Sequence, residues 1–396
     1  MKGALVCLVV LAAPWAEAQW RFEPALDVAM RTPAFHHLSA SGRKALALSE
    51  GHVGLAWEDD HSGTPRCYLA IKAPGSAGFT TRELGQGECY DPALAAMANG
   101  RFATIREESG GVMAALADTA TIGPSLILAP AGGQGSLTWH PTLGLQAAWS
   151  QPDGRWRRVR LARLASAGMA LSVLANASAD PKPLTDDQLY PTLASSASGH
   201  FLVWEDRRHG HTVVYASRSN DALSWAAPYR ISQNPTGKSE NNLGRGTGAM
   251  RPALTAFGAD SLAAVWLDKR DFLSGYDVYA ALSDDGGISF GKNLKVQDSF
   301  GDAIAQWHAG VAGNTHGDLA VAWDDERDGS ADVWLTWPTP AGFAENVAPG
   351  PAAGPGNQAD PVVALDAQGN LHMAWIERDP EGRSRLRYSR GRPVSR

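Results

Sequence analysis

The sequence predicts an all-β protein, a single β-propeller of four-stranded blades, with seven blades favoured and six as the alternative. Three observations support this prediction. A unit of roughly 40 to 60 residues recurs along the chain, which is a period typical of propeller blades. A tryptophan marks the second strand of the unit, and an X-Pro pair marks the beginning of its first strand. No long linker separates the copies, so we expect one closed domain.

The clearest copy of the unit spans residues 251–296. An alternating first strand follows Pro252, and a second strand ends at Trp266. A third strand is expected at 278–282 and a short outer strand at 293–296. Apolar and aromatic runs bounded by Gly, Asp and Ser favour four short strands joined by tight turns.

The other copies are found by the same two markers. The tryptophan recurs at Trp57, Trp149, Trp204, Trp266, Trp323 and Trp375, and Ile105 takes its place once. The X-Pro pair begins at Asp91, His140, Tyr190, Arg251 and Asp360, whereas His308 is followed by alanine. These markers give seven repeats.

The two ends of the chain predict export and ring closure. Residues 1–19 combine Lys2, an apolar stretch and a small-residue site near Ala18, a pattern typical of a secretory signal peptide. The propeller domain is then 20–396, secreted or periplasmic. The last repeat lacks an outer strand, and 20–26 resembles the outer strand at 225–231. Pairing the N-terminal strand into the last blade would remove an open sheet edge.

Composition limits the partners. The chain has 35 basic and 41 acidic residues and a net charge of -6, which argues against nucleic acid as a partner. After the signal peptide, no run reaches the ~18 to 20 apolar residues of a membrane span. Cys67 and Cys89 remain, and in an exported chain we expect them to form a disulfide worth about 3 kcal/mol. Two buried thiols are the alternative. The oligomeric state is not predicted.

Residues 283–290 read Ser-Asp-Asp-Gly-Gly-Ile-Ser-Phe and match the Asp-box pattern S-x-D-x-G-x-[ST]-[WF] at every position. Residues 219–225 are a shorter copy without the glycine. The chain therefore resembles the sialidase-like (BNR repeat) β-propellers. This resemblance implies the propeller fold over nearly the whole mature chain, and a sialidase would use an arginine triad, a Tyr and Glu nucleophile pair and an Asp acid. That triad has no convincing match here, seven repeats depart from the six blades of sialidases, and Asp boxes occur in propellers with unrelated functions.

The strand directions predict which face could bind a ligand. We call the end of the propeller at which first strands begin the upper face, and the opposite end, where Asp boxes lie, the lower face. The residues expected where first strands begin, close to the axis, are polar in every repeat: Asp91, His140, Tyr190, Arg251, His308 and Asp360, with Arg43 or Lys44 in the first repeat. Burying such groups unpaired would cost several kcal/mol. They are expected either to bind a ligand or to face water in the axial channel.

Two further patterns have structural interpretations. Trp-x-Asp-x-Arg recurs from Trp204, Trp266 and Trp323, and a motif repeated in successive blades is expected to fix hairpins rather than form one active centre. The acidic turn 324–332 faintly resembles a calcium loop, but Arg327 stands among the would-be ligands. No cofactor is expected, and calcium is a minor alternative. No zinc, P-loop or serine-hydrolase motif occurs.

The loops are uneven, and long polar insertions on one face of a repeat ring usually serve binding. The longest insertion spans 232–249 and contains Arg245, so we expect the pocket to lean toward repeats four to six.

Two functions follow. In the first, the protein binds and cleaves acidic glycans by sialoside hydrolysis or uronate β-elimination. Its catalytic residues would then be His140, Tyr190, Arg251 and His308, and its substrate-binding residues Asp91, Asp360, Arg245 and Arg43. In the second, the same face of a non-catalytic envelope propeller holds a glycan or a protein.

Overall fold

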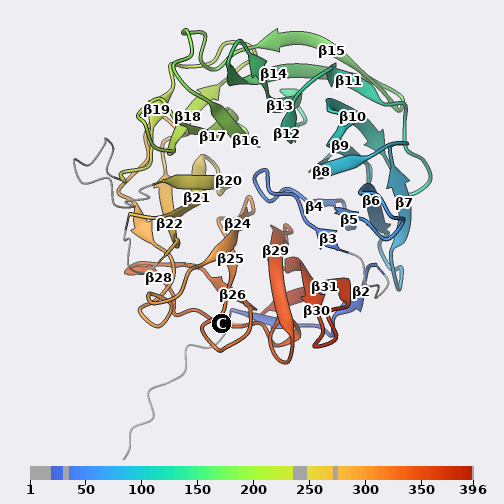
Figure 1. Cartoon of the computed structure of the whole chain (residues 1–396), viewed down its shortest axis with the longest axis vertical. Coiled ribbons are helices and arrows are strands. Elements are labelled where there is room, and N and C mark those ends of the chain that lie inside the picture. The colour runs from blue at the N-terminus through green and yellow to red at the C-terminus, as the bar shows by residue number, and fades with distance from the viewer. Residues whose placement is uncertain (1–18, 30–34, 235–247, 271–274, 395–396) are drawn as a thin grey trace, which may run out of the picture.

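A computed structural model describes residues 19–29, 35–234, 248–270 and 275–394. Seven antiparallel sheets stand around a central axis, as Figure 1 shows, so the predicted seven-bladed propeller is confirmed. Each blade runs outward from its first strand at the axis. Within the described ranges the one helix is the 3-10 turn η1 (Gly350–Ala352), and no helix is long and apolar enough to cross a membrane.

The first three blades follow one another directly in the chain. Blade one contains β3 (His36–His37), β4 (Leu46–Ser49), β5 (His52–Asp59), β6 (Arg66–Lys72) and β7 (Thr80–Leu84). Blade two contains β8 (Cys89–Ala96), β9 (Phe102–Glu108), β10 (Gly111–Ala117) and β11 (Leu126–Ala129). Blade three contains β12 (Gly133–His140), β13 (Gly144–Asp153), β14 (Trp156–Ala167) and β15 (Ala170–Ala177).

The next three blades repeat this order with shorter outer strands. Blade four contains β16 (Gln188–Ser196), β17 (Gly199–Asp206), β18 (Val213–Ser219) and β19 (Tyr229–Arg230). Blade five contains β20 (Ala249–Phe257), β21 (Ser261–Asp268), β22 (Asp277–Ser283) and β23 (Leu294–Lys295). Blade six contains β24 (Trp307–Gly313), β25 (Leu319–Asp325) and β26 (Asp332–Thr336), with the hairpin β27 (Pro338–Thr339) and β28 (Gly342–Phe343) after it.

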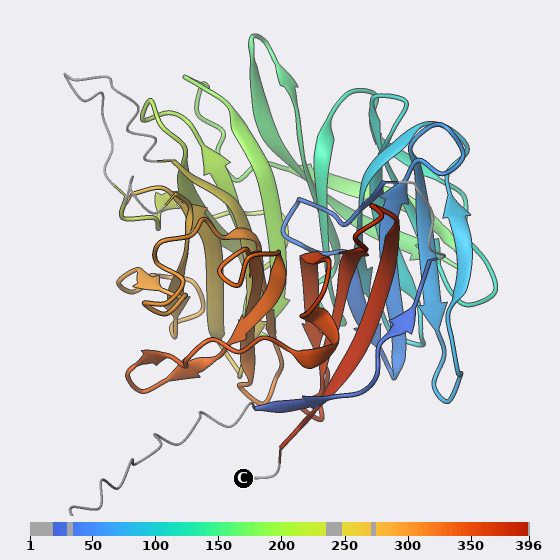
Figure 2. The same ribbon diagram turned by 60° about the horizontal axis from the view of Figure 1, so that its bottom comes forward.

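The N-terminal segment closes the ring, as predicted. Blade seven contains β29 (Asn357–Leu365), β30 (Leu371–Arg378) and β31 (Ser384–Pro393), and β1 (Trp20–Phe22) and β2 (Leu26–Asp27) pair with β31 at its outer edge. Figure 2 shows this N-terminal strand, in blue, running beside the red C-terminal strand. The Trp20 indole is buried and donates to the Gly369 carbonyl at 2.8 Å. Both ends of the described chain therefore belong to one sheet.

The marker tryptophans are buried, five of them among the largest side chains that are almost fully inaccessible. In blade two the sequence assignment was off by one position. Strand pairing places Ile105 opposite Ala93, as Val265 lies opposite Ala253 in blade five, so Arg106 takes the place of Trp266. The Arg106 guanidinium donates to Glu108 at 2.6 and 2.9 Å, which lets a charged side chain occupy the site because its partner is only two residues away.

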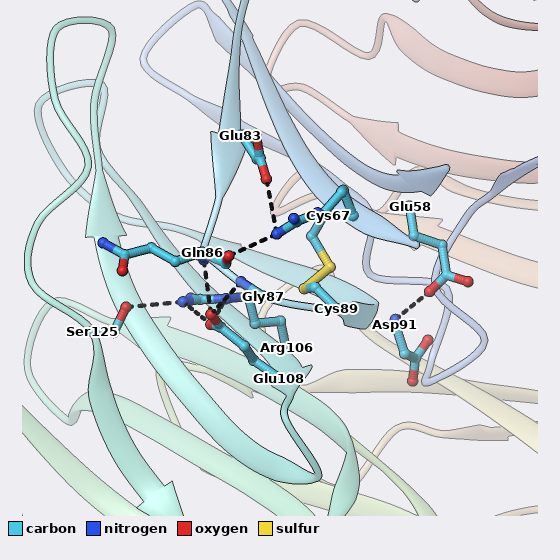
Figure 3. The surroundings of a disulfide bond; sticks show 11 residues. Glu58, Cys67, Glu83, Gln86, Gly87, Cys89, Asp91, Arg106, Glu108 and Ser125 are labelled. Atoms are coloured by element: carbon cyan, nitrogen blue, oxygen red, sulfur yellow. Dashed lines mark hydrogen bonds and ion pairs between the residues drawn. A yellow bond between two sulfur atoms is a disulfide. The ribbon is translucent and has the colours of Figure 1, made fainter. Parts of the chain in front are cut away.

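Cys67 and Cys89 form the disulfide that the sequence predicts, with their Cα atoms 5.4 Å apart. Cys67 lies near the beginning of β6 and Cys89 begins β8, so the bond links the first two blades at the upper face. Figure 3 shows it beside the hydrogen bond from the Asp91 amide to Glu58, which joins the same two blades.

The segment 38–44, which we call the axial plug, was not foreseen from the sequence. It lies across the middle of the ring in Figure 1 and contacts several blades. Leu38 donates its amide to Asp360 of blade seven, and Lys44 donates to the Leu254 carbonyl of blade five. Gly42 lies against Thr192 of blade four, where an added Cβ would come within 2.4 Å of the methyl group. The plug therefore fills the axis near the upper face.

Removal of the Trp20 side chain should destabilise the whole ring. Trp20→Ala should reduce the free energy of unfolding by about 3 to 5 kcal/mol, because a buried indole is lost at the closing edge. Chemical denaturation monitored by fluorescence measures the change. Arg21→Ala, an exposed neighbour on β1, is the control and should shift stability by less than about 0.5 kcal/mol. Equal shifts for the two variants would contradict closure by this strand.

A side chain at position 42 should loosen the axial plug. Gly42 has φ +64° and no room for a Cβ, so Gly42→Ala combines backbone strain with a clash against Thr192. Gly75→Ala is matched, since Gly75 has φ +75° and nothing within 4 Å of the added carbon. Thermal unfolding should show a loss about 1 to 3 kcal/mol larger for Gly42→Ala. Similar losses would show that the plug does not depend on close contact with blade four.

Candidate functional site on the upper face

The upper end of the axis is surrounded by seven residues in the left-handed backbone region. Their φ values lie between 47 and 62°, and we call them the axial ring: Arg43, Asp91, Gln134, Tyr190, Arg251, His308 and Asp360. In blades two to seven each sits in a β-bulge at the beginning of the inner strand, where the pairing register shifts. Non-glycine residues adopt this conformation at a cost of about 1 to 2 kcal/mol, so surrounding contacts must hold it.

Six of the seven ring positions agree with the sequence prediction, and His140 is wrong. His140 ends β12 at the lower face, whereas Gln134, with φ 59°, is the second residue of the same strand. The proline after His140 belongs to the turn between β12 and β13 rather than to a bulge. The spacing from the marker tryptophan could have identified Gln134. It precedes Trp149 by 15 positions, as Arg251 precedes Trp266. His140 precedes Trp149 by only 9 positions.

Hydrogen bonds between neighbouring blades hold most ring residues in place. A side-chain oxygen of one blade accepts the amide N–H of the ring residue in the next blade. These bonds run from Asp91 to Glu58 (2.6 Å), Gln134 to Glu107 (2.7 Å), Tyr190 to Gln134 (2.9 Å), Arg251 to Glu205 (2.6 Å) and Asp360 to Asp324 (2.9 Å). Blade five carries Leu267 at the equivalent position, which offers no acceptor. These hydrogen bonds link neighbouring blades near the axis.

Three of the predicted substrate-binding residues are engaged with the protein itself. Asp91 accepts hydrogen bonds from Ser39 Oγ (2.9 Å), Ala40 N (2.7 Å) and Ser41 Oγ (2.7 Å) of the plug. Arg43 is buried, pairs with Asp360 and donates to the Pro361 carbonyl at 3.0 Å. The buried Asp360 has its pKa lowered because Arg43 and His308 outweigh the effect of desolvation. These residues anchor the plug to blades two and seven.

Arg251 is the ring cation without a carboxylate partner among the described residues. Its guanidinium carbon lies 3.5 Å from the centre of the Tyr190 ring, so a cation–π contact joins blades four and five. Its Nη1 is buried and donates to no protein atom in the described ranges. Burial lowers the pKa of Arg251, and nearby Asp91 opposes this shift. A guanidinium stacked on a ring keeps its in-plane donors available for a ligand carboxylate.

His308 forms the second reactive group of the face. Its Nδ1 lies 2.7 Å from Asp324 Oδ1, and its side chain is 45% exposed. Desolvation opposes the charged form, but the carboxylates of Asp324 and Asp360 raise the pKa of His308 above its usual value. The preceding residue, Trp307, is 43% exposed and packs 5.4 Å from the Tyr276 ring. An oriented imidazole therefore lies beside an exposed aromatic surface.

The sequence prediction missed the carboxylates that follow the marker tryptophans. Glu58, Glu205 and Asp324 come directly after Trp57, Trp204 and Trp323, so their side chains point opposite to the indoles. Burial raises the pKa of Glu58 and of Glu205 to about 7. The alternation of strand residues could have revealed them, because successive residues of a strand point to opposite faces of the sheet and so toward different neighbouring blades.

The Trp-x-Asp-x-Arg motif has the structural role expected of it. In blade four the Trp204 indole donates to Asp206 at 3.0 Å, and Arg208 donates to the same carboxylate at 2.7 Å. The same arrangement occurs in blades five and six. In the acidic turn, Asp325 is therefore already bound by Trp323 and Arg327. No group of three or more His, Cys, Asp or Glu side chains within the described ranges could hold a metal ion.

The two Asp-box turns are built by their aspartates. Asp285 accepts amide hydrogen bonds from Ile288 and Ser289, both at 3.0 Å, and the Ser289 hydroxyl at 2.6 Å. These donors lower the pKa of Asp285 to about 2. Asp221 makes the corresponding bonds to Leu223 and Ser224 in the shorter copy. Both turns serve the fold rather than the upper face. Arg245 lies outside the described residues.

Glu205→Gln should change the pH dependence of stability. Because the pKa of Glu205 is raised to about 7, the folded state holds this proton more tightly than the unfolded state does. The stabilisation that protonated Glu205 gives the folded state is thus complete below about pH 4.5, and it is lost as pH rises toward 7. Glutamine keeps the acceptor for the Arg251 amide and carries no charge. The variant should be more stable than the parent by about 2 to 3 kcal/mol at pH 8 and nearly equal at pH 4.5.

Thermal unfolding at the two pH values measures this difference. Glu345→Gln, at an exposed position, is the control and should alter stability little at either pH. A Glu205→Gln variant that is less stable than the parent at pH 8 would show that the carboxylate is charged and favourable in the folded protein.

Comparisons with known proteins agree with the fold. A protein of unknown function from Dyadobacter fermentans superposes with a TM-score of 0.56 at 10% identity, over 95% of this chain and 100% of that one. The phage phi92 endosialidase superposes with a TM-score of 0.53 at 7% identity, over 95% of this chain and 70% of that one. A Trypanosoma rangeli sialidase bound to the inhibitor DANA superposes with a TM-score of 0.49 at 9% identity, over 90% of this chain and about half (54%) of that one. No family model and no curated protein matches the sequence. The resemblance to sialidase-like propellers is thus confirmed at the level of the fold.

Proposed function

We propose that this protein is an exported β-propeller that binds acidic glycans on its upper face, with Arg251 holding a sugar carboxylate. The observation that carries this proposal is the Arg251 guanidinium, which is stacked on Tyr190 and has a buried Nη1 without a partner in the described part of the chain. A desolvated cation of this kind is costly unless a ligand satisfies it. A carboxylate accepts two parallel N–H bonds from a guanidinium, which gives both affinity and orientation.

Aromatic side chains supply the surface for sugar rings. Trp307 precedes a ring residue and is 43% exposed, with Tyr276 beside it, and Tyr90 precedes another and is 38% exposed. Large rings with an apolar face and a polar tip are typical of sites that bind partly apolar, partly polar ligands. The combination of an arginine with exposed aromatic rings favours an acidic sugar over a neutral one.

His308 would supply the chemistry if the bound glycan is cleaved. With Nδ1 held by Asp324, its Nε2 can accept the C5 proton of a uronate. The C5 electron pair then forms a C4–C5 double bond as the C4–oxygen bond breaks, and the leaving sugar oxygen takes a proton from water. Arg251 neutralises the carboxylate. Sialoside hydrolysis fits less well, because Glu58 and Glu205 already accept backbone amides.

Non-catalytic binding is the second candidate. It is favoured by the engagement of Asp91, Arg43 and Asp360 with the plug, which leaves few unpaired groups on the ring. The same fold in an endosialidase supports a glycan ligand without choosing between the two. Export is supported by the sequence of residues 1–19 and by the disulfide, since such bonds persist in oxidising compartments.

Incubation with sialyllactose and polygalacturonate separates the candidates, with neutral arabinan as the control. Unsaturated product absorbance is expected from polygalacturonate if His308 acts as the base, and released sialic acid would indicate hydrolysis instead. Binding of the acidic glycans without any product would establish the non-catalytic function. Absence of binding to both acidic glycans would overturn the proposal.

Arg251→Ala should weaken binding of acidic glycans tenfold to a hundredfold, since a charge-assisted contact is worth about 1.5 to 3 kcal/mol. Its melting temperature should change little, because Arg251 makes no ion pair within the described chain. Arg270→Ala should do the reverse, because Arg270 pairs with Asp268 at 2.6 Å and donates to Asn293 at 3.0 Å. Calorimetric binding and thermal unfolding measure the two effects. If both variants mainly lose stability, the axial ring is structural.

A further inference from the structure

A cavity lies at the opposite end of the axis from the site described above. It has a volume of ≈ 670 Å³ and is enclosed by the ends of inner strands from blades one and three to seven. Lys44, at the lower end of the axial plug, and His140, at the end of β12, are both part of its lining. The plug lies between this cavity and the axial ring, so the two ends of the channel are separate sites.

Lys44 is the charged group of the cavity. Its Nζ donates one hydrogen bond, to the Leu254 carbonyl at 2.8 Å, and no carboxylate in the described ranges lies within ion-pair distance. An ammonium group has three donors, so two remain for water or a ligand. Desolvation lowers the pKa of Lys44 to about 8. The chain thus keeps an uncompensated cation inside its axis, which is costly unless an anion balances it.

The lining has a positive bias in an acidic protein. Lys44 and His140 are its ionisable residues, and no aspartate or glutamate contributes to it. The strands of blades four to seven contribute neutral residues to the wall. The whole chain carries a net charge of -6, so a lining without a carboxylate is a local departure from it, although Asp318 lies behind the lining residue Asn314 at 2.8 Å. A small anion would find attraction here and little repulsion.

The rest of the cavity lining contains side chains that could hydrogen-bond the hydroxyl groups of a ligand and pack against the apolar face of its ring. Thr138 and Ser195 hydroxyls lie 2.7 Å apart on neighbouring inner strands, and Thr255 lies on the next blade. Trp139 lines the cavity beside them and is partly buried. Sites that bind small molecules are typically cavities of several hundred Å³ whose mostly apolar lining carries a few polar groups.

We propose that this lower cavity binds a small organic anion that carries a carboxylate and several hydroxyl groups, in the manner of a sugar acid. The carboxylate accepts hydrogen bonds from Lys44 Nζ, while hydroxyls of the ligand donate to the oxygens of Thr138 and Ser195. The protons of these two side chains serve the bond between them and the Trp139 carbonyl. The site is independent of the glycan site on the upper face, because a different cation serves it and the plug lies between them.

Isothermal titration with D-gluconate and D-glucuronate tests the proposal, with glucose as the neutral probe of similar size. The wild-type protein should bind the two acids and bind glucose at least tenfold more weakly. Binding of all three with equal affinity would show that charge plays no part and would overturn the proposal, as would absence of binding to both acids.

The pH dependence identifies the cation in the unmodified protein. An anion held by Lys44 should lose affinity as pH rises from 7 to 9.5, because the ammonium group loses its proton on passing its pKa. An anion held by Arg251 should keep its affinity over this range, because arginine stays protonated. Constant affinity for D-glucuronate from pH 7 to 9.5 would therefore exclude Lys44 as its partner.

Two variants complete the test. Lys44→Gln keeps a donor for the Leu254 carbonyl while removing the charge, and it should bind D-glucuronate at least tenfold more weakly with its fold intact by thermal unfolding. Arg251→Ala should leave D-glucuronate binding at the lower cavity unchanged, even if it abolishes binding of polymeric glycans. The reverse pattern, with loss in Arg251→Ala and retention in Lys44→Gln, would assign the anion to the upper face and overturn the proposal. Failure of glycan binding with retained D-glucuronate binding would refute the proposed function alone.

Discussion

The structure depends on hydrogen bonds between neighbouring blades around the top of the axis. In blades two to seven one residue at the beginning of the inner strand enters the left-handed region. In all of these blades except blade six, a side chain from the preceding blade accepts the amide of that residue, as Glu205 does for Arg251 and Glu58 for Asp91. A buried amide without an acceptor would cost about 1 to 3 kcal/mol, so these acceptors are needed wherever the bulge is buried.

This requirement decides which polar groups remain for a ligand. Carboxylates near the axis, which would suit acid catalysis, are mostly bound to amides, to the plug or to arginine. Arg251 and His308 differ, because in the described part of the chain the guanidinium keeps an unpartnered Nη1 and the imidazole has only one of its nitrogens held. Arg251 Nη1 is consequently a donor that remains for a ligand on the described part of the upper face. That donor underlies the preference proposed for acidic ligands.

The axial plug turns one channel into two sites. Its contacts with Asp360, Thr192 and Leu254 reach blades that are distant in sequence, and Gly42 permits the closest approach. Arg43 at its upper end is neutralised by Asp360, whereas Lys44, the next residue, faces the lower cavity without a carboxylate. These two adjacent cations therefore have different surroundings. The chain turns at residues 42–45, with Arg43 in the left-handed region, before β4 begins.

The sequence by itself determined the repeat, the seven blades, the closing strand and the cysteine pair, because local periodicity and turn chemistry are encoded residue by residue. It also identified Arg251, Tyr190 and His308 as axial residues, since an X-Pro pair or its spacing from a tryptophan marks the bulge. Only the tertiary structure decided that His140 lies at the lower face and that Arg106 replaces a tryptophan. Only it revealed the axial plug, Lys44 in its cavity and the capture of Asp91 and Asp360 by other parts of the chain. Those features rest on contacts between segments up to some 300 residues apart, as between Leu38 and Asp360, and no local pattern records which distant partner a polar group will find.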